Sequence, residues 1–202
     1  MGLQRIVAEQ FGRPSGVLGN LSTFLMNRLN ARMYASVEEE IASREEAVLD
    51  LGFGNGYLLR RLAKRADNRY YGVDISSDMV AAASRRCRRF IELGAMRLEL
   101  GSAESLPYPD GFFDLIYTVN TVYFWPDLDQ GMAEIARALK PGGRFLNLFY
   151  TAKRLDLLPF TSSGFMKYTA EELAGAASRA GLTPAACAIQ PGLSLKINAK
   201  KP

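Results

Sequence analysis

Residues 48–62, with the sequence VLDLGFGNGYLLRRL, constrain the fold more than any other part of the chain. The segment begins with an apolar run, passes through glycines at alternate positions (Gly52, Gly54 and Gly56), and ends in an apolar pattern with helical spacing. A buried strand that turns through glycines into a helix is the first half of a βαβ unit, from which parallel sheets are built. The glycines let the backbone turn tightly and let a ligand approach without a Cβ in the way.

The rest of the chain continues this alternation of strands and helices. Strands are predicted at residues 47–51, 70–75, 95–101, 112–119 and 144–150, with helices at 57–66, from Ser76 or Ser77 to 90, and at 127–139. A capping box at Thr169 and Glu172 begins a further helix that ends at Gly181. Residues 183–190 and 193–200 flank a Pro-Gly turn and predict a closing antiparallel hairpin. The 202 residues, 48% of them hydrophobic, suffice for one core. With the strands predicted above, we expect an α/β fold with a seven-stranded, mostly parallel sheet.

The glycine spacing and the position of Asp74 predict a ligand that carries a ribose. The dinucleotide fingerprint G-x-G-x-x-G needs a glycine where Tyr57 stands, and a phosphate-binding P-loop needs a G-K-[ST] sequence that does not follow. Asp74 stands 18 residues after Gly56, at the end of the second predicted strand. A carboxylate at such a position accepts hydrogen bonds from a ribose diol in doubly wound nucleotide-binding folds. A ribose without a pyrophosphate fits this pattern.

Composition argues against several other classes of protein. The 25 Lys and Arg residues against 21 Asp and Glu make the chain mildly basic, which by itself does not indicate a nucleic-acid partner. Histidine is absent and Cys87 and Cys187 lack the spacing of metal ligands, so we expect reduced thiols and no metal site. No apolar run approaches the ~18 residues of a membrane span, and no secretory leader is visible. We expect a cytoplasmic location, while nothing in the sequence indicates an oligomeric state.

Four motifs in the middle of the chain resemble those of one known family. VLDLGFGNG resembles the family's first motif and GVDIS its ribose-binding second, while GSAESLPYPDGFFD is similar to its adenine-side segment and ARALKPGGRF to its turn into the fifth strand. Through these motifs, residues 48–150 resemble the class I S-adenosylmethionine-dependent methyltransferases, and most closely their small-molecule type 11 branch. The resemblance implies a doubly wound, Rossmann-like sheet and S-adenosylmethionine as cofactor, with S-adenosylhomocysteine as its product.

The resemblance also implies a set of cofactor-binding residues. The glycines of the first motif would line the methionine part of the cofactor, Asp50 would hold the loop and the cofactor's ammonium group, and Asp74 would bind the ribose. Two structural alternatives stay open, in which Asp50 caps the helix of a simple βα turn and Asp74 is a solvated carboxylate. The full implied set is Asp50, Gly52, Gly54, Gly56, Asp74, Ile75, Met79, Ser102, Ala103, Glu104 and Asn120.

The adenine side departs from the family pattern at one position. Met79 would lie against the adenine ring, although a methionine on a helix is also an ordinary core residue. Ser102, Ala103 and Glu104 would flank the adenine edge, and Asn120 would face the reacting methyl group. The family usually has Asp where Ser102 stands, and a hydroxyl accepts the proton of the adenine amino group more weakly than a carboxylate does.

Motifs that are missing from the sequence exclude some classes of methyl acceptor. Amino-methylating nucleic-acid enzymes carry [D/N/S]-P-P-[Y/F] after the fourth strand, and cytosine C5 enzymes need a Pro-Cys nucleophile; this chain has TVNTVYFWPD and no Pro-Cys pair. The run SRRCRRF is interpreted as a solvated helix face rather than a phosphate-binding surface. The aromatic residues of VYFWPD suggest an apolar pocket wall, with ordinary packing of the next helix as the alternative. An enzyme that methylates a small molecule is favoured over one that methylates RNA or protein. It is also favoured over a domain that binds the cofactor without catalysis.

Residues 1–45 are predicted to form an N-terminal helical extension, ahead of one compact domain at 46–202. A helix at residues 21–34 would place Asn27, Asn30 and Tyr34 in one uncharged polar stripe, with leucines on the other side. We hypothesise that this stripe contacts the substrate and that the helix is a lid; the alternative is a helix simply packed on the domain. Tyr34, and next Tyr123, are the candidates for contacting the acceptor. The aperiodic segment 151–168 is predicted to be a substrate loop.

Overall fold

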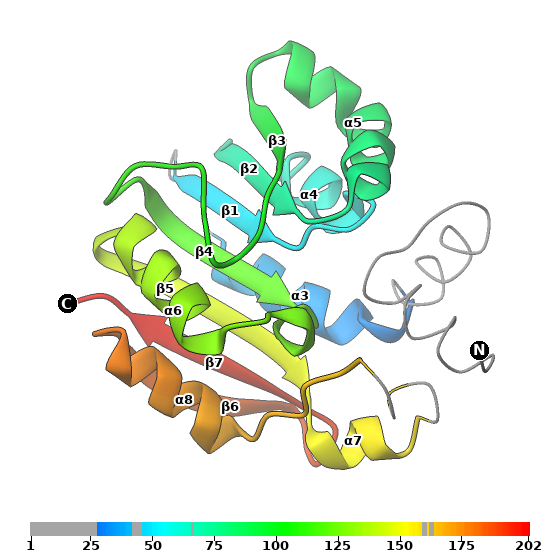
Figure 1. The fold of residues 1–202 in the computed structure, drawn as a ribbon. Coiled ribbons are helices and arrows are strands. Elements are labelled where there is room, and N and C mark those ends of the chain that lie inside the picture. Colours follow the sequence, from blue (N-terminus) through cyan, green and yellow to red (C-terminus); the bar gives the residue numbers. More distant parts are fainter. Residues whose placement is uncertain (1–27, 42–45, 66, 159–160, 162–163) are drawn as a thin grey trace.

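The computed structural model describes residues 28–41, 46–65, 67–158, 161 and 164–202. In this part of the chain, seven strands form one sheet in the order β3-β2-β1-β4-β5-β7-β6 (Figure 1). The strands are β1 (Ala47–Leu51), β2 (Arg69–Asp74), β3 (Met96–Leu100), β4 (Phe113–Val119), β5 (Leu139–Tyr150), β6 (Thr183–Gln190) and β7 (Ser194–Lys200). The predicted α/β sheet with a closing antiparallel hairpin is confirmed: β1 to β5 pair in parallel, and β7 runs antiparallel between β5 and β6.

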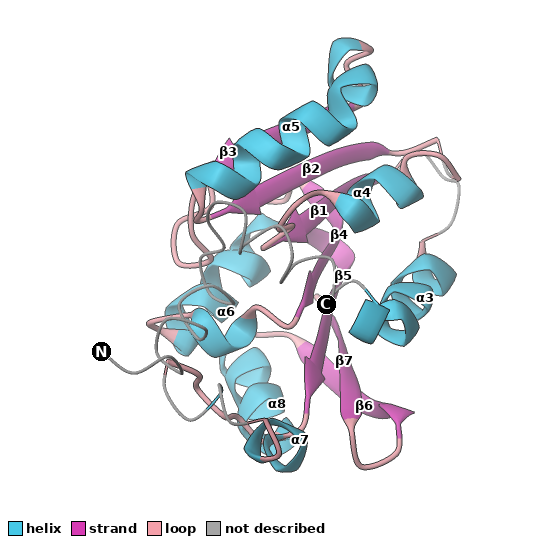
Figure 2. Cartoon of the chain, turned by 90° about the vertical axis from the view of Figure 1, so that its right-hand side faces the viewer, coloured by secondary structure: helices cyan, strands magenta, loops and turns pink. Residues whose placement is uncertain are grey.

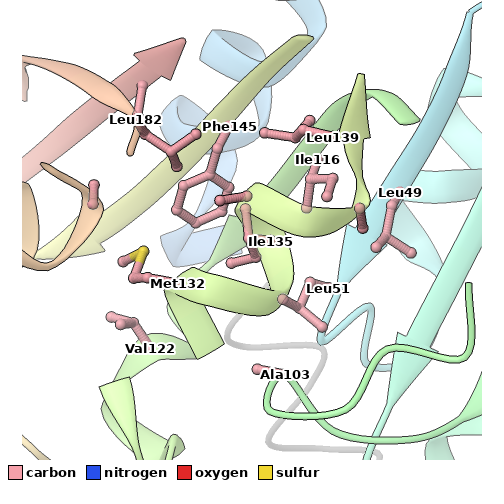
Figure 3. Packing of buried hydrophobic residues seen from close by; sticks show 14 of the residues in the cluster. Leu49, Leu51, Ala103, Ile116, Val122, Met132, Ile135, Leu139, Phe145 and Leu182 are labelled. Atoms are coloured by element: carbon pink, nitrogen blue, oxygen red, sulfur yellow. The ribbon is translucent and has the colours of Figure 1, made fainter. Parts of the chain in front are cut away.

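Helices cover both faces of the sheet (Figure 2). They are α3 (Ala31–Glu40), α4 (Tyr57–Leu62), α5 (Ser77–Glu92), α6 (Leu128–Ala138), α7 (Ala152–Asp156) and α8 (Ala170–Arg179), with a short 3-10 helix at Val122–Phe124. One apolar cluster joins α3, α4 and α5 to the sheet, and the other joins α6, α7 and α8 to its opposite face. Figure 3 shows the second cluster, in which Met132 and Ile135 of α6 pack against Phe145 of β5 and Ile116 of β4.

The predicted caps explain where several helices begin. Ser76 accepts a hydrogen bond from the backbone N–H of Met79, and Asp127 accepts one from Gln130, each at the start of a helix. The capping box of Thr169 and Glu172 is formed reciprocally at the start of α8. These polar side chains satisfy N–H groups that have no partner within the helix, so the local sequence determines these boundaries.

Most element boundaries lie within two residues of the prediction, but those of α4 and β5 differ more. The helix expected at 57–66 ends at Leu62, because the N–H groups of Lys64 and Arg65 bond three residues back and tighten the chain into turns. The helix expected to end at Leu139 ends at Ala138. Strand β5 begins at Leu139, five residues earlier than the predicted start at residue 144. Residues 141–143 therefore lie within a strand, whose register against β4 shifts at this point.

The N-terminal helix also differs, since it does not end at Tyr34. Residues 1–27 lie outside the described residues, and α3 runs from Ala31 to Glu40. Met33 and Val37 are fully buried in the apolar cluster that joins α3, α4 and α5 to the sheet, so packing rather than the polar stripe fixes this helix. In the described part of the chain, no helix combines the length and apolar character that crossing a membrane requires.

Candidate functional site

A cleft opens at the carboxyl ends of β1, β2 and β4, where the loops that follow these strands meet. The carboxyl edge of a parallel sheet is where open α/β folds bind ligands. The cleft is lined from the glycine turn after β1, from the end of β2, from the start of α5, from the loop after β3 and from the segment after β4, with α3 at one side. It unites residues that are distant in the sequence.

The three glycines of the turn after β1 all adopt left-handed backbone conformations, with φ between 56° and 81°. Gly52 and Gly54 line the cleft, whereas Gly56 does not. A Cβ on Gly56 would lie 2.8 Å from the Cβ of Ala83 on α5, so this glycine allows two helices to pack closely. A Cβ on Gly54 would meet no atom within 4 Å, so this position faces open space in the cleft. Gly56 thus has a packing role beside the cleft, while the predicted contact of the three glycines with a ligand stays a prediction.

Asp74 holds the glycine turn. One oxygen of its carboxylate accepts a hydrogen bond from the N–H of Gly54 at 2.8 Å, and the other accepts from the N–H of Ser76 at 2.9 Å. The side chain is buried rather than solvated, and burial raises its pKa although both hydrogen bonds oppose this. Each oxygen keeps a lone pair free for a further donor, and Ile75 beside it is exposed at the rim of the cleft.

Asp50, at the end of β1, lines the cleft and is 4% exposed. The hydroxyl of Tyr117 donates a hydrogen bond to its Oδ2 at 2.8 Å. Burial raises the pKa of Asp50 to about 8; the hydrogen bond from Tyr117 opposes this, and the negative charge of Asp74 adds to it. In the described residues the glycine turn is held by the Asp74 carboxylate, through the N–H of Gly54, and the role expected for Asp50 at the loop and the ammonium group stays a prediction.

On the other side of the cleft lie Met79, Ser102, Ala103 and Glu104. Met79 and Ala103 are buried, so their side chains form an apolar floor for a flat group. The Oε1 atom of Glu104 is buried and has no hydrogen-bond partner among the described residues. A buried carboxylate oxygen without a donor is costly, so this atom is an acceptor available to a ligand.

A hydrogen-bonded network closes the end of the cleft after β4. Asn120, the described non-glycine residue with a positive φ (59°), donates from its amide to Asn30 Oδ1 at 2.9 Å. The hydroxyl of Tyr150 donates to the same oxygen at 3.1 Å. Asn30 thereby fastens the start of α3 to the ends of β4 and β5. Asn30 and Tyr34 both line the cleft, so the described part of the polar stripe faces it; Asn27 lies outside the described residues.

Tyr123 does not line the cleft. Its hydroxyl donates to Asn120 Oδ1 at 3.0 Å and also contacts the backbone of Tyr150, so it supports Asn120 from behind. Burial raises the pKa values of Tyr34 and Tyr123 well above the usual value, which keeps both phenols protonated at neutral pH. Phe124 and Trp125, from the same aromatic run, do line the cleft as an apolar wall.

Sequence reasoning missed two residues that hold cleft residues in place from behind, one at Asp50 and one at Asn30. Tyr117 and Tyr150 lie in strands whose alternating apolar pattern predicts only packing. Their polar contacts follow from the strand order, for which the sequence carries no local signal. The described residues of segment 151–168 do not line the cleft; Phe165 reaches it indirectly, with its ring 4.7 Å from that of Phe124.

Comparison with known proteins finds relatives of this chain by sequence. A family model described as a methyltransferase domain matches residues 49–147. The chain is 38% identical over 103 residues to an uncharacterised methyltransferase, YdaC, of Bacillus subtilis. The aligned stretch makes up 50% of this chain and 55% of that protein. It is also 32% identical over 168 residues to a demethylmenaquinone methyltransferase of Tropheryma whipplei. This alignment covers 83% of this chain and 65% of that protein. The alignments thus span less than two thirds of either relative.

Solved structures share the fold at low identity. One is geranyl diphosphate C-methyltransferase from Streptomyces coelicolor, solved in complex with Mg²⁺, geranyl diphosphate and S-adenosylhomocysteine. It superposes with a TM-score of 0.75 and 15% identity over 87% of this chain and 82% of that one. At this identity the likeness concerns the fold alone.

Proposed function

Because this chain belongs to the class I S-adenosylmethionine-dependent methyltransferases, in their type 11 branch, we propose that it transfers a methyl group from S-adenosylmethionine to a small-molecule acceptor. The observation that carries the proposal is the buried Asp74 carboxylate at the end of β2, which holds the glycine turn through the N–H of Gly54 and borders the cleft. A carboxylate so placed is preorganised for a ribose diol.

Four features of the cleft fit this cofactor. The open space at Gly54 leaves room for a chain that runs along the turn, where a side chain would block it. Asp74 offers free lone pairs for two hydroxyl groups, and the unpaired Oε1 of Glu104 offers an acceptor beside the apolar floor of Met79 and Ala103. Asp50 offers a buried carboxylate for an ammonium group. Ser102, which replaces the usual Asp, lies in the same lining, so Glu104 supplies a carboxylate that Ser102 lacks.

The chain contributes to the reaction by position rather than by proton transfer from its tyrosines. The cofactor, when bound, would supply a methyl group on a positively charged sulfur: the acceptor atom would bond to the methyl carbon while the carbon–sulfur bond breaks, and S-adenosylhomocysteine would leave as the neutral thioether. Tyr34 stays protonated and therefore acts as a hydrogen-bond donor to the acceptor rather than as a general base. Asn120, held by Tyr123 and Asn30, presents a fixed polar wall at the same end. Alignment in a site that excludes water supplies much of such a rate.

The start of α3 forms the acceptor side of the cleft. Asn30 and Tyr34 line it, and Arg32 is exposed on the outer surface. Of the N-terminal extension predicted at residues 1–45, ahead of the domain at 46–202, the structure describes residues 28–41, and this part borders the acceptor side; the rest lies outside the described residues. The apolar wall of Phe124 and Trp125 favours an acceptor with an apolar body, and the demethylmenaquinone of the Tropheryma relative is a small molecule of this kind.

The test has a binding part and a transfer part. S-adenosylhomocysteine should bind the purified protein, and Asp74→Asn should weaken binding at least tenfold, because each hydrogen bond to a charged group contributes about 1.5–3 kcal/mol. Calorimetry measures both affinities, and Asp78→Asn on the exposed first turn of α5 is the matched control. Equal affinities of Asp74→Asn and the control would remove Asp74 from the site.

Incubation with methyl-labelled cofactor and fractionated metabolites then identifies the acceptor. Label in a small-molecule fraction supports the proposal. Label only in RNA or protein would contradict the proposed acceptor class, and tight binding without transfer to any fraction would contradict the proposed activity.

A further inference from the structure

We infer that Tyr117 is a positioning residue for the amino-acid end of the cofactor, because its hydroxyl holds the Asp50 carboxylate ready for an ammonium group. The inference rests on the proposed function, since it needs a ligand with an ammonium group near Asp50. It assigns a role to a residue of β4 that does not itself line the cleft.

The geometry comes from the sheet. β1 and β4 are neighbours in parallel register, and Asp50 and Tyr117 are direct partners in that register. The Tyr117 hydroxyl donates to Asp50 Oδ2 at 2.8 Å, and this is its only hydrogen bond to the described residues. The Tyr117 ring is fully buried in the apolar cluster that contains α3 and α4, and the packing around it holds the ring in this position. One oxygen of Asp50 is thereby fixed, while the residue still lines the cleft.

The surroundings of Asp50 make this contact necessary. The titratable groups that face it are Tyr34 on α3, Asp74 on β2, Cys87 on α5 and Tyr117 on β4. None of these four carries a positive charge, and the charge of Asp74 repels a second carboxylate. Burial acts in the same direction, because it disfavours the charged form. The hydrogen bond from Tyr117 is the contact that favours the carboxylate over the neutral acid.

Removal of the hydroxyl has a definite consequence. In Tyr117→Phe the ring still fills its site, but burial and Asp74 act on Asp50 unopposed, so its pKa rises above the value of about 8 in the native protein. With a pKa of about 8, only a minor fraction of Asp50 is ionised at pH 7 in the native protein. In Tyr117→Phe this fraction falls further, so forming the carboxylate that the ammonium of a ligand needs costs more free energy. Groups of the ligand that lie elsewhere in the cleft lose nothing.

The experiment compares two ligands. S-adenosylhomocysteine carries the ammonium group, whereas 5′-methylthioadenosine keeps the adenosine and the thioether but lacks the amino-acid end. Calorimetry on the full chain from pH 6.5 to 8.5 should show that Tyr117→Phe weakens S-adenosylhomocysteine by about 10- to 100-fold at pH 7. The deficit should shrink as the pH rises and ionises Asp50. The affinity for 5′-methylthioadenosine should not change.

Tyr70→Phe is the control, since Tyr70 is a buried tyrosine of the same apolar cluster on β2 and does not line the cleft. It should leave the affinities for both ligands unchanged, whatever it does to the thermal midpoint. An unchanged affinity for S-adenosylhomocysteine in Tyr117→Phe would overturn the inference, and so would an equal weakening of both ligands, which indicates a merely structural role. If the native protein binds neither ligand, the proposed function fails and the inference fails with it. Measurements on the native protein therefore test the proposed function, and measurements on Tyr117→Phe test the inference.

Discussion

At the scale of single residues, two glycines of one turn perform different tasks. Gly52 and Gly54 share left-handed backbone, but a Cβ on Gly52 would lie 2.3 Å from Thr121 Cγ2, whereas a Cβ on Gly54 would enter open space. We therefore expect Gly54→Ala to lose about 1–2 kcal/mol of stability from backbone strain and most of its affinity for S-adenosylhomocysteine. Gly52→Ala should lose more stability, because Thr121 must also move. Thermal unfolding and calorimetry measure the two effects.

Gly111 provides the matched control for this prediction. Its φ is 62°, a Cβ would meet nothing within 4 Å, and it does not line the cleft. Gly111→Ala should show the stability loss of Gly54→Ala with undiminished ligand binding. If both variants bound the ligand as well as the native chain does, Gly54 would not face the cofactor.

At the scale of elements, α3 is fastened to the sheet at both ends. Asn30 binds the ends of β4 and β5 beside the cleft, while Glu40 forms ion pairs with Arg144 at 2.7 Å and Lys196 at 2.6 Å at the far end. Burial raises the pKa of Glu40, but Lys196 and Arg144 lower it more, so the folded pKa lies below the ordinary value. A depressed carboxyl pKa adds stability above the unfolded pKa of about 4.3 and loses it as the pH falls through the folded pKa.

The two ends should therefore respond differently to substitution. Glu40→Gln should lower the thermal midpoint at neutral pH, and its difference from the native chain should shrink as the pH falls below about 4. Methyl transfer should be largely retained. Asn30→Ala should cost about 1 kcal/mol at every pH and should reduce kcat/KM, because Asn120 and Tyr34 lose a partner beside the acceptor. Full transfer activity in Asn30→Ala would contradict a role for α3 at the acceptor side.

At the scale of the whole molecule, the arginines of α5 lie outside the lining of the cleft. Arg85, Arg86, Arg88 and Arg89 are exposed, and none of them lines it; Arg88 pairs with Glu92 and Arg86 with the Asn55 side chain. Transfer to a small acceptor should therefore change little between 50 and 200 mM salt, whereas binding through 6–10 phosphates would fall about 10³- to 10⁵-fold. Replacing the four arginines with glutamine should leave transfer intact. Salt-sensitive RNA binding that this variant loses would overturn the small-molecule proposal.

The local pattern of the sequence determined the elements and one edge of the site. Strand periodicity, helix caps and glycines are read within about ten residues, so the sheet, the turn after β1 and the position of Asp74 could be predicted. The carboxyl ends of parallel strands meet at one edge, which places Asp50, Asp74 and Asn120 together once the strands are known.

Only the tertiary structure decided how these side chains are paired. The bond between Tyr117 and Asp50 joins residues 67 apart in the sequence, and that between Asn120 and Asn30 joins residues 90 apart. The first depends on β4 lying beside β1 in a particular register, and the second on where α3 packs; neither depends on the neighbouring residues of the chain. Tertiary packing also explains why Gly56 lies against α5 and Tyr123 lies behind Asn120, rather than in the lining of the cleft. A hydrogen bond needs about 3 Å between two atoms, and only the packed sheet and its helices set distances that short between distant segments.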